Sequence, residues 1–583
     1  MFLSDLFRSF RPLHNPLGFG AADFLLLALG VLLTTAILLR ALLAPFLAKL
    51  AGRTPLAMAV LAGTSVLLRL ALLGSSPAPV PAGADDFSYL FLADTLRHAR
   101  LANHTHPLFQ FFEAVFVLQQ PTYSSIYPLG QGLVLAAGHL LFGTYWAGVL
   151  ASVAALSALT FWMLRAWVSP RWAFGGGLLA LIQFGPLNQW TNSYWGGAVS
   201  ACAGCLVWGA LPRLFHTLDA RQTAKPRLPA VLLGLGLALQ LLTRPFEFLL
   251  LVLSVCLYLL TNRRSRASAS VARKVAFYIA LAFLPATALT LLQNKSVTGS
   301  VTTLPYMLSR YQYGVPATFT WQPNPVPHRP LTPEQDLDYR AQAAIHGPGN
   351  DAGSQFLSRL GFRLRYLRFF WLAPLFLAFA FYIPKLREPK WRWPPLFVAL
   401  FLAGTNFYPY FFPHYVAALS SLLLLIAVKG LETLSHLNIR AYPAGSIASR
   451  LILCLCAAHF LFWYALHLSA NENLLPATAF ETGDFINFGD PEGRIAIGSQ
   501  LAQLPGRHLV FVRYSPYHRF GEWIANGADI DSERVVWALD RGSAENENLI
   551  RYFPARRSWL LEPDARPPKL TSYLTESTPA HQE

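Results

Sequence analysis

The chain has 583 residues, of which 54% are hydrophobic and 13% are charged, whereas an average soluble domain is about 25% charged. Its mean hydropathy is +0.38, so the composition excludes an ordinary soluble globular protein and indicates a protein with many membrane helices. The net charge of +16 does not call for a nucleic acid partner, because many of the basic residues gather in short segments between apolar runs.

Apolar runs follow one another along most of the chain, each close to the ~20 residues that cross a hydrocarbon core of roughly 30 Å. The first run is too long for the apolar core of a cleaved signal peptide, so we expect it to stay as an anchor, preceded by an interfacial segment, residues 1–21. We expect about twelve membrane helices, near residues 22–47, 55–74, 146–167, 172–188, 195–212, 228–243, 245–262, 275–293, 366–384, 394–409, 411–429 and 450–468.

Three short basic segments, 213–227, 263–274 and 385–392, separate these runs. Loops rich in Lys and Arg remain on the cytoplasmic side. Residues 294–365 and the tail are then on the opposite side. The first loop lies on this non-cytoplasmic side as well only if the short apolar stretch 127–143 does not cross the membrane. This stretch follows Pro128 and contains four glycines, so we expect an interfacial or re-entrant helix, within a first outer region of residues 75–143.

The tail, residues 470–583, is less apolar and more charged than the rest. Three strand-like stretches, 508–514, 534–539 and 557–563, alternate with helix-compatible segments, a pattern typical of a small α/β domain. The five cysteines all lie in apolar segments, which predicts no disulfide framework. The fold class expected is therefore mainly α: a transmembrane helical bundle over residues 22–469 and a small extracytoplasmic α/β domain.

Two adjacent carboxylates, Asp85 and Asp86, stand at the start of the first outer region. Such a pair just outside the bilayer is well placed to hold a general base, and each acid raises the pKa of its neighbour by charge repulsion. A structural alternative is that the two residues cap a helix beginning at Phe87, because Asp is a favoured N-cap residue.

Several motifs in order resemble the C-type (GT-C) membrane glycosyltransferases. They are DDFSYLFLADTL (85–96), PTYSSIYPLGQGLVLAAGHLLFG (121–143), NSYWGG (192–197), TRPFEF (243–248) and FFPHYVAAL (411–419). The nearest branch holds the protein O-mannosyltransferases and lipid A aminoarabinose transferase. The likeness runs through most of residues 55–430 and leaves out the tail.

The resemblance implies transfer of a sugar from a polyprenyl-phosphate donor to a lipid, glycan or protein acceptor, on the non-cytoplasmic face and with inversion. It gives the role of base to Asp85 or Asp86, with a slight preference for Asp85. Some relatives have an arginine three residues after the acidic pair, where this chain has Tyr89. Candidates for the donor phosphate or other substrate contacts are therefore Arg244, Glu247, His414, Arg97, Lys295, Arg310, Tyr89 and Tyr127.

Other readings stay open. Arg244 and Glu247 could instead form an ion pair between helices, and His414 among aromatic residues is also typical of interfacial anchoring. We predict no cofactor, and a divalent ion near His104 and His106 stays open. Two alternative functions are a catalytically inactive scaffold and a lipid-linked sugar transporter of cell-envelope biogenesis. The Arg-, Ala- and Leu-rich composition favours a bacterial plasma membrane, with the active site and the tail facing the periplasm or exterior.

Overall fold

The structure is a computed structural model of the 583-residue chain. It describes residues 29–33, 35–36, 43–81, 83–219, 226–261, 269–351, 353–468, 493–518 and 521–573. The expected interfacial segment 1–21, most of the expected first span 22–47 and the expected domain boundary at residue 470 lie outside these residues. Parts of the first two basic segments, including Arg221 and Arg264, also lie outside them.

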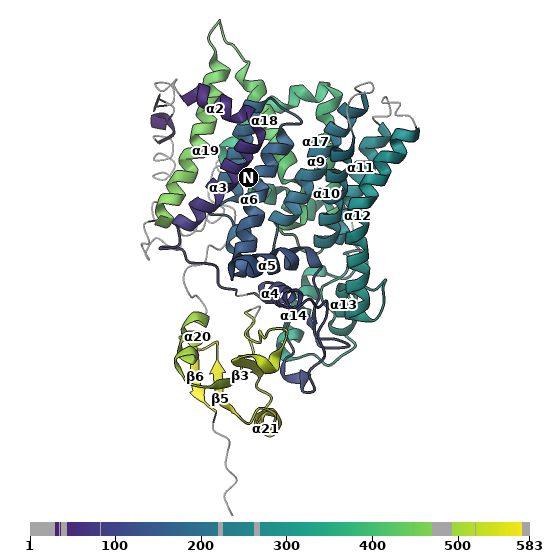
Figure 1. The fold of residues 1–583 in the computed structure, drawn as a ribbon, viewed down its shortest axis with the longest axis vertical. Coiled ribbons are helices and arrows are strands. Elements are labelled where there is room, and N and C mark those ends of the chain that lie inside the picture. The colour runs from purple at the N-terminus through teal and green to yellow at the C-terminus, as the bar shows by residue number, and fades with distance from the viewer. Residues whose placement is uncertain are drawn as a thin grey trace, which may run out of the picture. The chain divides into compact units, whose positions relative to one another are not determined.

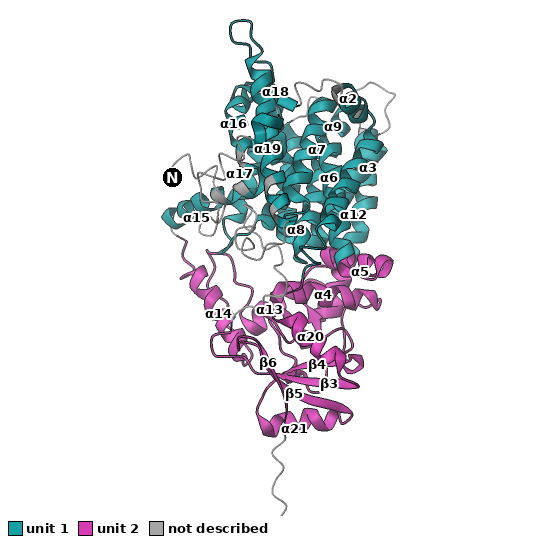
Figure 2. Cartoon of the chain, turned by 90° about the vertical axis from the view of Figure 1, so that its left-hand side faces the viewer, with its two compact units in different colours: residues 1–79, 146–288, 352–488 teal, residues 80–145, 289–351, 489–583 magenta. Residues whose placement is uncertain are grey.

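The chain forms two compact units that do not follow its linear order (Figure 2). Unit 1 comprises residues 1–79, 146–288 and 352–488, and unit 2 comprises residues 80–145, 289–351 and 489–583.

Unit 1 is built from helices (Figure 1). Its α-helices are α2 (Leu43–Gly52), α3 (Thr54–Ala71), α6 (Tyr145–Leu164), α7 (Pro170–Phe184), α8 (Gln189–Asn192), α9 (Ala198–Asp219), α10 (Arg227–Thr243), α11 (Pro245–Thr261), α12 (Ala269–Thr298), α15 (Gly353–Tyr366), α16 (Phe376–Tyr382), α17 (Trp393–Thr405), α18 (Ser420–Ser435) and α19 (Ala444–Leu468). The end of α12 belongs to unit 2. Buried Leu, Phe and Ala side chains, including Phe161, Phe184 and Leu422, form one continuous core among these helices.

Six helical stretches within the described residues are long and apolar enough to cross a membrane, in agreement with an integral membrane protein. They are Thr54–Ala71, Tyr145–Leu164, Ala198–His216, Ser270–Thr298, Pro413–Ser435 and Ala444–Ala465. Helices α10 and α11 are apolar but shorter. Helices α7 and α17 also occupy predicted spans, with only 15 and 13 residues.

One predicted span is wrong. Residues 366–384 do not form a continuous helix: two 3₁₀ segments, Leu367–Phe370 and Ala373–Leu375, lead into α16. Helix α16 has seven residues and is ~10 Å long, too short for a hydrocarbon core of roughly 30 Å. Pro374 and Pro384 explain the interruption, because proline lacks the backbone donor that a helix interior needs.

Unit 2 joins the three segments expected on one side of the membrane. Its elements are α4 (Ala84–Arg97), β1 (Val117–Leu118), β2 (Ser124–Ser125), α5 (Leu129–Phe142), α13 (Pro305–Tyr313), α14 (Pro333–His346), α20 (Arg494–Gln503), β3 (Arg507–Val512), β4 (Val535–Leu539), α21 (Ser543–Tyr552), β5 (Arg556–Glu562) and β6 (Lys569–Ser572). Helix α5 has 14 residues and lies in the apolar stretch 127–143, for which an interfacial or re-entrant helix is expected. It approaches α4 closely, because a Cβ on Gly132 would lie 2.6 Å from Leu92 Cγ.

The tail contains the small α/β fold that its sequence predicted. Strand β3 pairs in parallel with β4 and β5, and β6 pairs antiparallel with β5, in the order β4-β3-β5-β6. The three predicted strands coincide with β3, β4 and β5 within about two residues. The short fourth strand was not predicted.

The sheet and the first outer region share one hydrophobic core. Phe91, Phe111 and Tyr123 pack in the same cluster as Val510 and Trp523. Segments that share a core lie on the same side of a membrane. The shared core supports the prediction that the first outer region and the tail occupy one compartment.

Asp94 on α4 links the two parts of this core. Its Oδ2 accepts a hydrogen bond from the backbone N–H of Ala528 at 2.7 Å, and its Oδ1 accepts one from Arg97 Nη2 at 2.7 Å. Burial raises the pKa of Asp94, but the hydrogen bonds from Ala528 and Arg97 outweigh burial and hold it below its usual value. The stabilisation from this carboxylate is present above its ordinary pKa near 4 and is lost as the pH falls through the lowered value.

We expect Asp94→Ala to destabilise the protein by about 1.5–3 kcal/mol at pH 7, because the hydrogen bond from the buried N–H of Ala528 to this charged group contributes roughly that amount. The measurement is thermal unfolding of the detergent-solubilised chain by tryptophan fluorescence. The control is Asp529→Ala, which removes an exposed carboxylate one residue after Ala528. Equal melting temperatures for the two variants would contradict the assigned role of Asp94.

Candidate active site

The two acidic residues lie inside the first turn of α4. The helix begins at Ala84, and its N-cap is Gly83, which makes no side-chain capping bond. The interpretation of Asp85 and Asp86 as caps of a helix that begins at Phe87 is therefore wrong. Their carboxylates lie at the positive end of the helix dipole, which favours the charged form of an acid. Asp85 is half-buried, and Asp86 is buried.

Tyr127 holds the carboxylate of Asp85. Its hydroxyl donates a hydrogen bond to Asp85 Oδ1. The backbone of Tyr127 is itself fixed, because its carbonyl accepts from Gln293 Nε2 at 2.8 Å and its N–H donates to Ser125 Oγ at 3.2 Å. One oxygen of Asp85 is thus positioned by a tyrosine that is anchored at both backbone groups.

Two further tyrosines enclose this pair. The ring of Tyr89 stacks on Tyr127 with centroids 4.1 Å apart, and the ring of Tyr306 meets Tyr127 edge-on at 5.8 Å. Burial, followed by the charge of Asp85, raises the pKa of the Tyr127 hydroxyl well above its usual value. Tyr127 therefore stays protonated at neutral pH and remains a hydrogen-bond donor to Asp85. The structure thus brings together three of the predicted site residues, Asp85, Tyr89 and Tyr127.

Asp338 on α14 was missed by the sequence analysis. It is 7% exposed, and its Oδ2 accepts from Gln342 Nε2 at 3.0 Å. Burial, followed by the negative charge of Asp85, raises its pKa to about 7. Asp85 therefore has a second carboxyl group in its electrostatic surroundings, one that changes charge near neutral pH.

The sequence does carry a signal for Asp338. Helix α14 begins with a capping box formed by Thr332 and Gln335. Its buried residues are Gln335, Asp338, Gln342 and His346, a polar stripe at helical spacing. A polar stripe on one helix face is normally exposed to solvent. Because the stripe on α14 is buried, it must contact polar groups of other segments.

Three predicted cationic contacts lie in unit 2, and two of them have other partners. Arg97 is at the far end of α4 from Asp85 and forms an ion pair with Asp94 at 2.7 Å. Arg310 donates from Nε to the carbonyl of Pro316 at 3.0 Å and so supports the loop after α13. Lys295 is exposed near the end of α12.

The remaining predicted contacts lie in unit 1. Arg244 follows the last residue of α10, and its guanidinium lies 5.0 Å from the ring centroid of Tyr415. The ring of His414 meets the same tyrosine at 4.7 Å, and His414 is buried. Glu247 is buried in the first turn of α11. The structure thus gathers Arg244 and His414 around one aromatic ring.

The histidines considered for a divalent ion do not form a cluster with the acidic pair. His106 Nε2 lies 3.2 Å from Asp531 Oδ1, and His106 Nδ1 accepts from the N–H of Leu108 at 2.9 Å. The described residues contain no group of three or more His, Cys, Asp or Glu side chains arranged to hold a metal ion.

No protein-family model matches the chain, and no curated protein matches it in sequence. Among solved structures it is similar to apo ArnT from Cupriavidus metallidurans, with 13% identity over 86% of this chain and 92% of that chain and a TM-score of 0.47. ArnT bound to undecaprenyl phosphate matches with 12% identity over 86% and 92% and a TM-score of 0.47. The apo oligosaccharyltransferase from Archaeoglobus fulgidus matches with 12% identity over 87% of this chain and 69% of that chain and a TM-score of 0.44.

ArnT is a lipid A aminoarabinose transferase, and both proteins are C-type glycosyltransferases. The predicted resemblance is therefore confirmed at the level of structural similarity. With TM-scores below 0.5, the likeness carries no conclusion about the activity of this chain.

The raised pKa of Asp338 predicts how pH affects stability. Because Asp338 keeps its proton in the folded state up to about pH 7 but loses it near pH 4 when unfolded, wild-type stability falls across this interval. Asp338→Asn removes this dependence and keeps the acceptor for Gln342. We expect the variant to gain melting temperature relative to wild type between about pH 4 and 7, with a constant difference above pH 7.

The matched control is Asp336→Asn, which changes an acid of the same helix that pairs with Arg340 at the surface. Two outcomes would contradict the assigned environment of Asp338. One is the same pH-dependent gain in melting temperature for Asp336→Asn, and the other is an Asp338→Asn variant that is less stable than wild type at pH 8.

Proposed function

We propose that this protein is an inverting glycosyltransferase that moves a sugar from a polyprenyl-phosphate donor to a lipid, glycan or protein acceptor on the non-cytoplasmic face of the membrane. The observation that carries the proposal is the Asp85 carboxylate, held by the buried hydroxyl of Tyr127 in the first turn of α4. The order of the sequence motifs supports the choice of donor class. A bacterial plasma membrane is the proposed location, with unit 2 facing the periplasm or exterior.

Asp85 is the proposed base. The acceptor hydroxyl gives its proton to Asp85 while its oxygen forms a bond to the anomeric carbon of the donor sugar. The bond between that carbon and the phosphate oxygen breaks, and the electron pair leaves with the phosphate. Attack from the face opposite the leaving group inverts the anomeric configuration. Tyr127 holds Asp85 through Oδ1, and the carboxylate is proposed to take the proton from an acceptor hydroxyl within hydrogen-bond reach.

The leaving phosphate needs cationic or N–H groups, because negative charge collects on it in the transition state. Arg244 and His414, which lie around the ring of Tyr415 in unit 1, remain the candidates for this contact that the sequence predicted. An ionisable residue between two apolar helices is a candidate functional site by position. Arg97 is not proposed for this role, because its guanidinium is held by Asp94.

We expect Asp85→Asn to abolish transfer of labelled sugar from polyprenyl-phosphate donors in single-turnover assays, while the purified variant stays monodisperse and folded. Asn keeps the shape and the acceptor for Tyr127 but cannot take up a proton from the acceptor. Asp86→Asn, one residue further along α4, is the matched comparison and should retain more activity. Full activity of Asp85→Asn would remove Asp85 as the base.

We expect Tyr127→Phe to lower the rate of transfer by roughly 10- to 100-fold, because a hydrogen bond to a charged group is worth about 1.5–3 kcal/mol. The ring stack with Tyr89 stays in place, so the variant should fold, with a melting temperature lowered by the loss of this hydrogen bond. Tyr311→Phe removes the hydroxyl of an exposed tyrosine in unit 2 and serves as the control. A wild-type rate for Tyr127→Phe would show that the hydroxyl does not support the base.

A further inference from the structure

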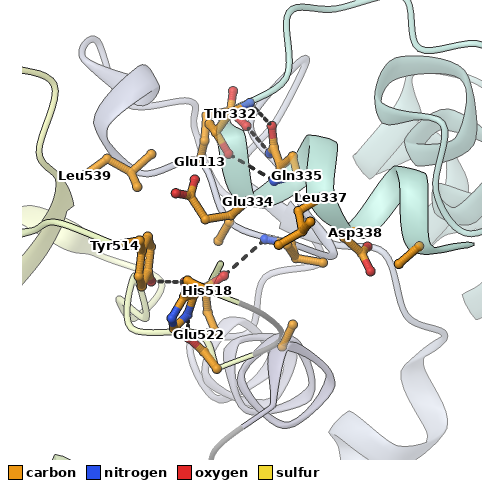
Figure 3. Close-up of a pocket in the computed structure, with 15 residues that line it drawn as sticks. Glu113, Thr332, Glu334, Gln335, Leu337, Asp338, Tyr514, His518, Glu522 and Leu539 are labelled. Atoms are coloured by element: carbon orange, nitrogen blue, oxygen red, sulfur yellow. Dashed lines mark hydrogen bonds between the residues drawn. The ribbon is translucent and has the colours of Figure 1, made fainter. Parts of the chain in front are cut away.

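Unit 2 contains a pocket next to the proposed base (Figure 3). Its walls come from three parts of the chain: the first outer region, helix α14 and the tail. Ala84, which directly precedes Asp85, lines it together with Asp338 from α14 and Tyr514 from the tail. The pocket has a volume of about 30 Å³. Since one water needs roughly 10–15 Å³ by this measure, there is room for a small polar group rather than for a whole sugar.

Two of the carboxylates in its walls are fully engaged. Glu113 accepts from Arg329 Nη2 at 2.9 Å, from Tyr313 at 3.1 Å and from Gln335 at 3.1 Å. Glu522 accepts hydrogen bonds from the hydroxyl of Tyr514 and from two backbone N–H groups. These two acids therefore join the walls to one another.

Two other carboxylates of the pocket have an oxygen without a partner. Within the described residues, Asp338 Oδ1 and Glu334 Oε2 are buried and accept no hydrogen bond. A buried polar atom without a hydrogen-bond partner destabilises the folded state, and more so when it is charged. An ionised carboxylate is an acceptor only, so when both acids are charged, which for Asp338 requires a pH above about 7, the group that satisfies these oxygens must donate O–H or N–H hydrogens. A phosphate or carboxylate would be repelled.

We propose that this pocket is an acceptor subsite, which binds a hydroxyl- or ammonium-bearing arm of the acceptor through Glu334 and Asp338 and rejects anionic groups. This inference rests on the proposed function, because in that reaction the acceptor, and not the donor phosphate, meets the base. The pocket begins at the residue before Asp85, which suits a substrate whose reacting hydroxyl reaches Asp85. The tail supplies part of the pocket wall and so takes part in acceptor selection.

The test uses the full-length protein in detergent and three soluble probes: glucosamine, N-acetylglucosamine and glucuronate. They carry an ammonium group, neutral donors and a carboxylate respectively. Saturation-transfer NMR gives their affinities for wild type, for Glu334→Gln, and for the double variant Glu334→Gln with Asp338→Asn. We expect glucosamine and N-acetylglucosamine to bind wild type and glucuronate not to bind. The double variant should lose at least tenfold in glucosamine affinity.

The control Asp336→Asn, on the same helix, should bind all three probes as wild type does. Equal binding of glucuronate to wild type, or unchanged glucosamine affinity in the double variant at a retained melting temperature, overturns the proposal. Glu334→Gln alone keeps the test informative if the double variant fails to fold.

Asp85→Asn separates this inference from the proposed function. Loss of transfer with retained probe binding supports both. If probe binding depends on Glu334 and Asp338 but Asp85→Asn retains full transfer activity, the acceptor subsite is supported and the role of Asp85 as the base is overturned. If Asp85→Asn loses transfer but probe binding is the same with and without Glu334 and Asp338, Asp85 stands as the base and the acceptor subsite is overturned.

Discussion

The hydrogen bond from the Tyr127 hydroxyl to Asp85 depends on further hydrogen bonds that hold Tyr127 in place, one of them from Gln293, which is distant in the sequence. Tyr127 is fixed through its carbonyl by Gln293 at the end of α12 and through its N–H by Ser125 in β2. Ser125 in turn lies 2.7 Å from Ser88 on α4, one turn after Asp85. The carboxylate is therefore held between a helix end, a strand and a second helix. The side chains of Gln293, Ser125 and Ser88 thus connect Tyr127 to both helices.

Unit 2 shows how a membrane chain builds such a site from separated loops. Residues 80–145, 289–351 and 489–583 each leave the apolar part of the chain at a different point and fold together. The first and third share one core, in which Phe91 and Tyr123 from the first pack with the sheet of the third. The second supplies Glu113 with the partners Arg329 and Gln335. The polar network and the hydrophobic core thus connect different pairs of segments.

Hydropathy and charge were sufficient for the fold class, because crossing a bilayer requires long apolar runs and because basic loops report their side. They failed where proline interrupts an apolar run, as at Pro374. In the site, the acidic pair and its neighbours Tyr89 and Tyr127 were predicted from motifs. Asp338 was not, because its raised pKa depends on burial and on a charge more than 250 residues away in the chain. Long-range contacts of this kind leave no local pattern.

The shared core of the tail and the first outer region has a consequence for biosynthesis. Phe91, Phe111 and Tyr123 emerge early, whereas their partners on β3 follow about 400 residues later. At a synthesis rate of roughly 5–20 residues per second, the strands that pack on these aromatic side chains are made some 20 to 80 s later. During this interval their apolar surface has no partner in the third segment of unit 2, and exposed apolar surface of this kind favours aggregation. A ribosome that stops before the tail releases a protein with its membrane helices complete and its outer core open.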